Sequence, residues 1–320
     1  MKTALITGIL GQDGIHLTKL LSNKGYKIFG LLNNKRNPTI ISFLDKFPKI
    51  ELIEGNLTDS ESLFQAVEFS QPDEIYNLGG ISSVGSSFSN AELSMEVNGK
   101  GVLNLLEAAK YLFSHKEIKF YQASSSEMYG KAEHFPQNEL TIFNPVSPYA
   151  KAKVYAHNTC VSYRETFGMH ISCGILFNHE GEYRREEFVT RKITKSIAQI
   201  SQGKLDKIRL GTLEPKRDWG YAGDYVEAMW LMLQQQNPDD YVIATGKTHS
   251  VRDFLSAAIN ASGLEGKPDD FVIIDDTFKR PAEVDLLVGD ASKAKRKLGW
   301  EPKVSFEELV LKMVNHDLKN

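Results

Sequence analysis

The chain has 320 residues, of which 41% are hydrophobic, enough for a large core in one α/β unit or in two lobes. The net charge of −3 and the pI of about 6.3 indicate no basic surface for nucleic acid. There is no apolar run long enough to span a membrane and no signal-peptide pattern, so we expect a soluble, cytoplasmic protein without a membrane partner. Cys160 and Cys173 lie in apolar segments and are expected to be buried thiols rather than a disulfide.

The first half of the chain alternates short apolar segments with amphipathic ones. We predict strands over 3–7, 26–32, 50–53, 74–78, 118–124 and 171–177, and helices over 15–23, 63–69, 93–113 and 149–167. Thr58 and Glu61 have the spacing of a capping box for the helix over 63–69. This alternation is typical of an α/β fold with a Rossmann-type, doubly wound parallel sheet.

The pattern becomes less regular after Asn178. Short strands are predicted over 207–210 and 271–274, and residues 239–246 are typical of one more strand of the main sheet. No linker rich in Pro or Gly separates these pieces, so we expect a smaller C-terminal lobe interleaved with the first domain. The expected division assigns 1–178 with 215–248 to the first domain, and 179–214 with 249–320 to the smaller lobe.

Three glycines, Gly8, Gly11 and Gly14, lie where the first strand passes into the first helix. Glycines at this point allow a tight turn and the approach of a pyrophosphate to the positive end of the helix. Their spacing differs from the common GxGxxG dinucleotide motif, and a glycine-rich turn without function is the alternative. The context of strand, turn and helix favours a dinucleotide site.

The end of the second predicted strand indicates which dinucleotide is bound. NAD enzymes usually have an acidic residue there, whereas this chain has Asn33 and Asn34 followed by Lys35 and Arg36. Two basic residues favour a 2′-phosphate and therefore NADP, although NAD is not excluded. The alternative is a solvated basic loop.

A Tyr, a Lys and a Ser form a candidate proton-transfer site. Tyr149 and Lys153 are four residues apart on a predicted helix, and Ser125 follows a predicted strand. A phenol is a weak base at pH 7, but a nearby ammonium and an oxidised nicotinamide both favour its phenolate. The phenolate can accept the proton of a substrate hydroxyl while hydride leaves. The Tyr-x-x-x-Lys spacing also arises by chance about once in such a chain, so ordinary surface residues are the alternative.

With these motifs the chain resembles the extended short-chain dehydrogenases, and within them the GDP-mannose 4,6-dehydratases. The resemblance covers nearly the whole length. It rests on segments distributed along the chain in order: Ala4–Gly14, Tyr121–Gly130, Ser147–Tyr149, Tyr163–Gly168, Gly174–Glu180, Phe188–Ile193, Arg217–Gly220, Ile243–Gly246 and Arg280–Asp285.

The resemblance implies a lyase reaction in which Glu127 has a central role. Tyr149 and NADP would oxidise C4 of the sugar, and the resulting ketone makes the C5 hydrogen acidic. Glu127 would remove this hydrogen and pass a proton to the departing C6 hydroxyl, and hydride would then return to C6. The product is a GDP-4-keto-6-deoxy sugar. Related epimerases carry a small apolar residue at the position of Glu127.

The resemblance also implies the binding residues and the assembly. The first domain would bind NADP, and the smaller lobe would bind the nucleotide sugar. No metal ligand is expected, and the two long helices are expected to pair with a second subunit in a homodimer or tetramer. The catalytic set is Ser125, Glu127, Tyr149 and Lys153; the cofactor set is Gly8, Gly11, Gln12, Asp13, Gly14, Lys35, Arg36, Asn56, Leu57, Leu78, Tyr149 and Lys153; the substrate set is Ser82, Glu127, Asn178, Val189, Lys192, Arg217, Arg280 and Glu283.

Several positions depart from the family pattern and leave the sugar open. Ile81 replaces a Gln, Val146 replaces an Arg, and the segment 181–185 differs although Arg184 is kept. We interpret these changes as lying around the hexose, so the substrate is GDP-mannose or another nucleotide sugar, such as a GDP-heptose or a GDP-N-acetylhexosamine. Two further functions are consistent with the same residues: an epimerase or reductase of the same fold, and a non-catalytic NADP-binding protein.

Overall fold

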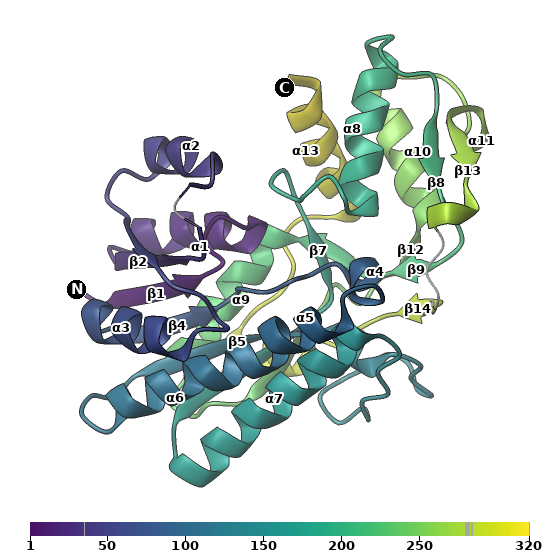
Figure 1. Ribbon diagram of the computed structural model, residues 1–320. Coiled ribbons are helices and arrows are strands. Elements are labelled where there is room, and N and C mark those ends of the chain that lie inside the picture. The colour runs from purple at the N-terminus through teal and green to yellow at the C-terminus, as the bar shows by residue number, and fades with distance from the viewer. Residues whose placement is uncertain (35, 279–281, 283, 320) are drawn as a thin grey trace.

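The computed structural model describes residues 1–34, 36–278, 282 and 284–319 (Figure 1). Within these residues, seven strands form one sheet in the order β11-β6-β5-β4-β1-β2-β3, and each neighbouring pair is parallel. The doubly wound parallel sheet is thereby confirmed. Its strands are β1 (Thr3–Thr7), β2 (Lys27–Leu32), β3 (Glu51–Glu54), β4 (Glu74–Asn77), β5 (Lys119–Ser125), β6 (His170–Leu176) and β11 (Asp240–Ile243).

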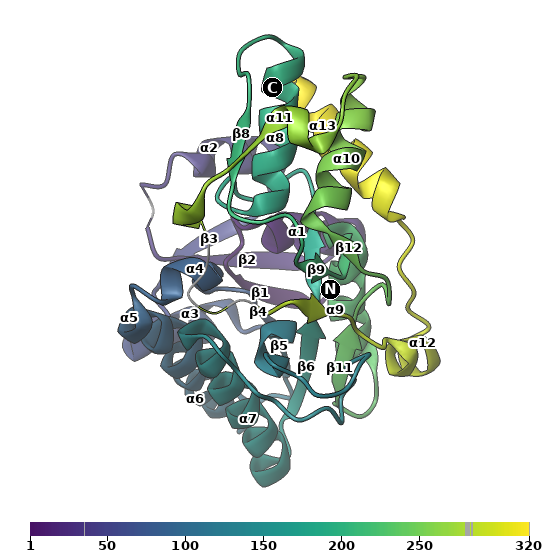
Figure 2. The ribbon, with the colours of Figure 1, turned by 90° about the vertical axis from the view of Figure 1, so that its right-hand side faces the viewer.

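Helices cover both faces of the sheet, which explains why its central strands are buried along nearly their whole length rather than alternating between buried and exposed residues. Leu17 and Leu21 of α1 (Gln12–Asn23) and Met229 and Met232 of α9 (Ala222–Gln234) belong to the core on one face. The other face is covered by α3 (Ser60–Ser70), α6 (Gly101–Phe113) and α7 (Pro148–Phe167). Figure 2 shows α6 and α7 side by side along this flank.

A smaller lobe stands above the carboxyl ends of the strands (Figure 1). Its helices α8 (Val189–Ser201), α10 (Val251–Ser262) and α13 (Phe306–Lys319) contact one another around a separate apolar cluster. The strands β8 (Ile208–Leu210) and β13 (Val272–Ile274) pair beside them. Segments on both sides of β11 in sequence therefore build this lobe, and the exact division of the chain into domains stays a prediction.

The remaining elements are short. They are α2 (Thr39–Lys46), α4 (Val84–Ser87), α5 (Ala91–Met95), α11 (Pro268–Phe271), α12 (Ser292–Leu298), β7 (Asn178–Glu180), β9 (Lys216–Arg217), β10 (Trp219–Tyr221), β12 (His249–Ser250) and β14 (Leu286–Leu287), with single-turn segments Ser126–Tyr129 and Asp276–Phe278. Strand β7 pairs with β10, and β9 pairs with both β12 and β14, at the junction between the lobe and the sheet.

Two local predictions were wrong in detail. The N-cap of α3 is Asp59, whose carboxylate accepts the backbone N–H groups of Glu61 and Ser62, so Thr58 forms no capping box. The helix predicted over 93–113 is α5 followed by a π-helical turn, Glu96–Lys100, and then by α6. An α-helix and a π-helical turn differ only in their local hydrogen bonds, so the spacing of apolar residues does not distinguish them.

The two cysteines match their prediction, because Cys160 and Cys173 are buried free thiols. Among the described residues, no helix is both long enough and apolar enough to cross a membrane.

Candidate active site

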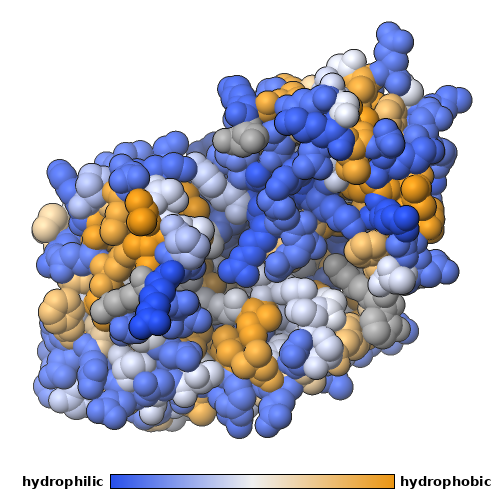
Figure 3. Space-filling view, turned by 45° about the horizontal axis from the view of Figure 1, so that its top comes forward, coloured by the Kyte–Doolittle hydropathy of each residue, from blue (hydrophilic) through white to orange (hydrophobic). Residues whose placement is uncertain are grey.

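A cavity of about 1530 Å³ lies between the sheet and the smaller lobe. Its floor consists of residues at the carboxyl ends of β1, β4, β5 and β6, and its roof comes from the loop after β7 and the segment before β9. This is the edge where open parallel sheets bind their ligands. In the space-filling view a furrow lined by hydrophilic side chains runs between the two parts (Figure 3).

The predicted catalytic residues converge on this cavity from two adjacent elements. Ser125 ends β5, and Glu127 lies in the single turn that follows, with its backbone N–H donating to Ser125 Oγ at 3.2 Å. Tyr149 and Lys153 lie in the first two turns of α7, where Ser147 is the N-cap. All four line the cavity, and Glu127, Tyr149 and Lys153 are at most 9% exposed.

Burial governs the ionisation of both members of the Tyr–Lys pair. It raises the pKa of Tyr149 to about 12, although a hydrogen bond with Ser125 offsets part of this rise. It lowers the pKa of Lys153 to about 8, and Lys153 Nζ donates to the carbonyl of Ala123 at 2.9 Å. The sequence predicts that the ammonium favours the phenolate, but Ser125 is the partner that lowers the Tyr149 pKa most, while Lys153 Nζ lies 5.8 Å from the centroid of the ring.

The glycine-rich turn has the geometry of an anion site. Gly8 has φ of 68°, and a Cβ at this position would lie 2.9 Å from the backbone of Gly79. Gly11 is the N-cap of α1 and provides no side chain, so the first N–H groups of the helix have no side-chain cap. The predicted residues Gly8, Gly11, Gln12, Asp13 and Gly14 all line the cavity.

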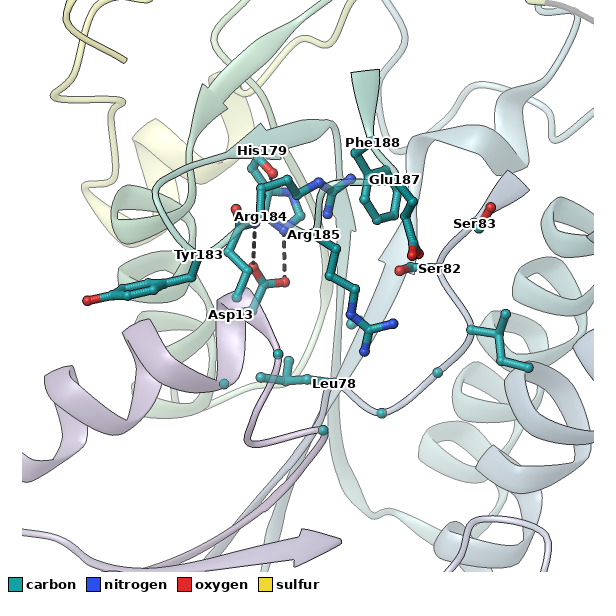
Figure 4. Close-up of a pocket in the computed structure, with 18 of the residues that line it drawn as sticks. Asp13, Leu78, Ser82, Ser83, His179, Tyr183, Arg184, Arg185, Glu187 and Phe188 are labelled. Atoms are coloured by element: carbon teal, nitrogen blue, oxygen red, sulfur yellow. Dashed lines mark hydrogen bonds and ion pairs between the residues drawn. The ribbon is translucent and has the colours of Figure 1, made fainter. Parts of the chain in front are cut away.

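Asp13 is held by a residue that the sequence pattern did not identify. His179 Nε2 lies 2.9 Å from Asp13 Oδ2 (Figure 4). The Nδ1 atom of His179 lies 2.8 Å from the carbonyl of Phe177. Burial raises the pKa of Asp13, but the charge and hydrogen bond of His179 outweigh it and lower that pKa to about 2. Burial alone would lower the pKa of His179, but the charge and hydrogen bond of Asp13 outweigh burial, so the pKa of His179 is raised. The sequence signals for His179 were its position just after a sheet strand and its place in the segment Gly174–Glu180, which matches the family pattern.

Some of the remaining predicted cofactor residues line the cavity and others do not. Asn56, Leu57 and Leu78 line the cavity, as do Asn33 and Asn34 at the end of β2. Arg36 is exposed and is not among the lining residues, and Lys35 lies outside the described residues.

On the substrate side, the described members of the predicted set line the cavity: Ser82, Asn178, Val189, Lys192 and Arg217. Arg217 is 7% exposed, and Lys192 Nζ lies 3.5 Å from the ring centroid of Phe278. Arg280 and Glu283 lie outside the described residues.

The departures from the family pattern are not all at the cavity. Ile81 and the segment after Gly181 contribute lining residues, whereas Val146 packs against an apolar cluster that includes Met128 and Phe177. The prediction that Val146 lies beside the hexose is therefore not supported, because its partly buried side chain packs against this cluster and is not among the residues that line the cavity.

Two arginines of the 181–185 segment were not in the predicted set. Arg184 Nε lies 2.9 Å from Glu180 Oε2, and its guanidinium lies 3.5 Å from the centroid of the Phe188 ring. Arg185 points into the cavity towards Leu78 (Figure 4). In the sequence, the adjacent pair Arg184 and Arg185 was the feature that could have indicated a binding role.

Together, the parallel sheet, the glycine turn and the Ser–Tyr–Lys set define an enzyme of the extended short-chain dehydrogenase class. A solved structure of this class, the Thermus thermophilus UDP-glucose 4-epimerase in complex with NAD, is 26% identical, covers 98% of each chain and has a TM-score of 0.86.

The family follows from the sequence comparisons. The family model for GDP-mannose 4,6 dehydratase matches residues 5–313. GDP-mannose 4,6 dehydratase 2 of Arabidopsis thaliana is 48% identical over 99% of this chain and 87% of its own length. The Drosophila melanogaster GDP-mannose 4,6 dehydratase is 47% identical over 99% and 86%. This chain belongs to the GDP-mannose 4,6-dehydratase family.

Proposed function

We propose that the protein converts GDP-mannose, or a close GDP-sugar, into the GDP-4-keto-6-deoxy sugar with loss of water. Membership of the family supports the reaction type. The observation that carries the proposal is the position of Glu127, a buried carboxylate two residues from Ser125 in the cavity that Tyr149 lines. Elimination of water requires a second acid/base group, at C5 of the sugar, which the oxidation at C4 alone does not need.

The residues present fit a nicotinamide dinucleotide. The first N–H groups of α1 have no side-chain cap and can donate to a pyrophosphate, and the absence of a Cβ at Gly8 allows the tight turn beside Gly79. When bound, the cofactor accepts hydride from C4 and returns it to C6. Asn33 and Asn34 replace the acidic residue that usually binds the NAD ribose, so we infer NADP as the preferred form.

The chain's own residues carry the proton transfers in this proposal. Tyr149 accepts the proton of the C4 hydroxyl as hydride leaves C4, and Ser125 binds the same oxygen. Glu127 then removes the C5 hydrogen as a proton and delivers a proton to the C6 hydroxyl, which departs as water. As hydride returns to C6, C5 takes up a proton, and release of the proton that Tyr149 accepted restores the balance. Lys153 keeps the local potential positive, which favours the phenolate form that the Tyr149 base requires.

The nucleotide part of the substrate is assigned to the roof of the cavity. Arg217 and Arg280 are proposed to bind the diphosphate, since a planar guanidinium binds phosphate oxygens in pairs. Lys192 and Asn178 also line the cavity. Glu283 is proposed to accept a hydrogen bond from a ribose hydroxyl.

A screen of nucleotide sugars tests the proposal. Purified protein with catalytic NADP is expected to convert a GDP-hexose to a product lighter by one water, as mass spectrometry would detect. Continuous consumption of NADPH without loss of water would identify a reductase, and a product of unchanged mass would identify an epimerase. Turnover of a GDP-heptose or GDP-N-acetylhexosamine in place of GDP-mannose would keep the chemistry but change the sugar.

A further inference from the structure

Helix α7 carries a third polar residue in line with its catalytic pair. Tyr149, Lys153 and His157 are spaced by four residues, so they lie on one face of the helix. All three are buried, with 8%, 9% and 5% exposure. His157 has no part in the proposed chemistry, yet a buried imidazole is costly unless its nitrogens have partners.

Three consecutive residues of β5 meet this stripe. Ser125 forms a hydrogen bond with Tyr149, and the carbonyl of Ala123 accepts Lys153 Nζ at 2.9 Å. Between them, Ser124 Oγ lies 3.0 Å from His157 Nδ1, and this contact is buried. The end of β5 is therefore joined to α7 at three successive turns of the helix. The contact through Ser124 is buried, whereas the contact between Lys153 and Ala123 is partly buried.

The other side of His157 is also held. Its Nε2 lies 3.7 Å from Asp240 Oδ2 of β11, and Phe143 contacts the ring edge-on at a centroid distance of 5.2 Å. Arg164 donates to both oxygens of Asp240, at 2.9 and 3.1 Å. Because this guanidinium already neutralises Asp240, we do not assign a metal to the nearby donors His157, Cys173 and Asp240.

We propose that His157 is a positioning residue that acts through Ser124 to hold the register between β5 and α7. It touches no reacting atom. Its bond to Ser124 lies two helical turns, about 12 Å along the axis, from Tyr149, and so resists rotation and sliding of α7 against the strand. The proposal rests on the proposed function, because it concerns the alignment of Tyr149 with Ser125.

The chemical consequence concerns the strength of the base. The hydrogen bond from Ser125 lowers the Tyr149 pKa that burial raises. If α7 shifts, this bond lengthens and the phenolate is less stabilised. Loss of His157 should therefore affect the catalytic step rather than the affinity for substrate.

The test compares matched variants. His157→Leu is expected to lower kcat roughly tenfold, with KM within about twofold, and to move the acidic limb of the kcat–pH profile to higher pH. His157→Asn keeps a polar group near the position of Nδ1 and should restore most of kcat. Ser124→Ala should reproduce the effect of His157→Leu, and the double variant should be no worse than either single one.

His170→Leu is the control, since His170 is also a buried histidine, at the start of β6 and away from the cavity lining. The inference is overturned if, in both Leu variants, kcat falls only as much as the loss in melting temperature explains and the acidic limb of the kcat–pH profile does not move. Additive effects of Ser124→Ala and His157→Leu would also overturn it. Should His157→Leu not fold, the pair Ser124→Ala and Ser124→Thr decides, because only the alanine should shift the limb.

A further arm separates this inference from the proposed function. If Tyr149→Phe keeps full activity, the assignment of the base fails, whatever His157 does. If Tyr149→Phe is inactive while His157→Leu matches the wild type in kcat and pH profile, only the role of His157 fails.

Discussion

Tyr149 and Glu127 are proposed to share the proton chemistry between a phenol and a carboxylate. Both are buried at the junction of β5 and α7, where water competes weakly for their protons. The pKa of Tyr149, about 12, is too high for a base at neutral pH without further help. We infer that the positive charge of a bound oxidised nicotinamide provides that help, which links the activity of the base to occupancy of the cofactor site.

Replacing Glu127 by Gln should separate the redox step from the elimination. The amide keeps the size of the side chain but cannot accept the C5 proton, so turnover should fall by roughly 10² to 10⁴. The first hydride transfer should remain, visible as a single-turnover rise in NADPH absorbance. Exchange of the C5 hydrogen with solvent deuterium, followed by NMR, should stop.

The Tyr149→Phe variant is the comparison for this experiment. It should lose the NADPH signal as well, since nothing accepts the C4 hydroxyl proton. Wild-type turnover in Glu127→Gln would remove Glu127 from the mechanism and favour a reductase or an epimerase.

At the scale of elements, the turn between β1 and α1 depends on one backbone conformation. Gly8→Ala introduces both a left-handed strain and a contact at 2.9 Å with Gly79, whereas Gly25→Ala has a similar φ of 76° but nothing within 4 Å of its Cβ. Both should lose about 1 kcal/mol from the strain. Only Gly8→Ala should lose more than this and bind NADP at least tenfold more weakly, measured by denaturation and fluorescence titration. Equal losses in the two variants would contradict the role of the close contact.

The Asp13–His179 pair joins α1 to β7, and its contribution to stability should depend on pH. The lowered pKa of Asp13, about 2, stabilises the fold above its ordinary 3.8, and this is lost as pH falls towards 2. The raised pKa of His179 stabilises the fold below its ordinary 6.5, and this is lost as pH rises through the raised value. The coupling should therefore be largest between these two ordinary pKa values.

A double-mutant cycle with Asp13→Asn and His179→Gln measures this coupling by urea denaturation. We expect about 1–2 kcal/mol near pH 5, decreasing at both lower and higher pH. The exposed pair Lys27–Glu51, with a distance of 3.1 Å, is the control and should give about 0.5 kcal/mol or less. A coupling independent of pH would show that the two side chains are not charged partners.

At the scale of the whole molecule, we propose that the flank formed by α5, α6 and α7 pairs with a second subunit. It exposes Leu93, Tyr111, Tyr155 and Phe167, each more than 40% accessible. Tyr155→Glu should weaken a dimer by at least tenfold, measured by light scattering after size exclusion, because it places charge in an apolar interface. Ile41→Glu, which changes an exposed residue of α2, should have no effect. A wild-type monomer would refute the pairing.

The sequence by itself determined the sheet and pointed to most of the proposed catalytic residues. The strands β1, β2 and β4–β6 are rich in apolar residues and alternate with helices, so a local pattern is enough to locate them. Gly8, Tyr149 and Lys153 were identifiable because backbone conformation and helical spacing are local properties. Ser125 followed from its place at the carboxyl end of a strand. The role of Glu127 was implied by the resemblance to the dehydratases.

Only the tertiary structure decided which distant groups meet. His179 pairs with Asp13, Ser124 pairs with His157, and Val146 packs against the cluster of Met128 and Phe177, so that segments up to 166 residues apart meet. The choice of Asp59 over Thr58 as the N-cap depended on one turn of backbone geometry. Such contacts arise from packing and desolvation in the folded chain, and no period or spacing in the sequence encodes them.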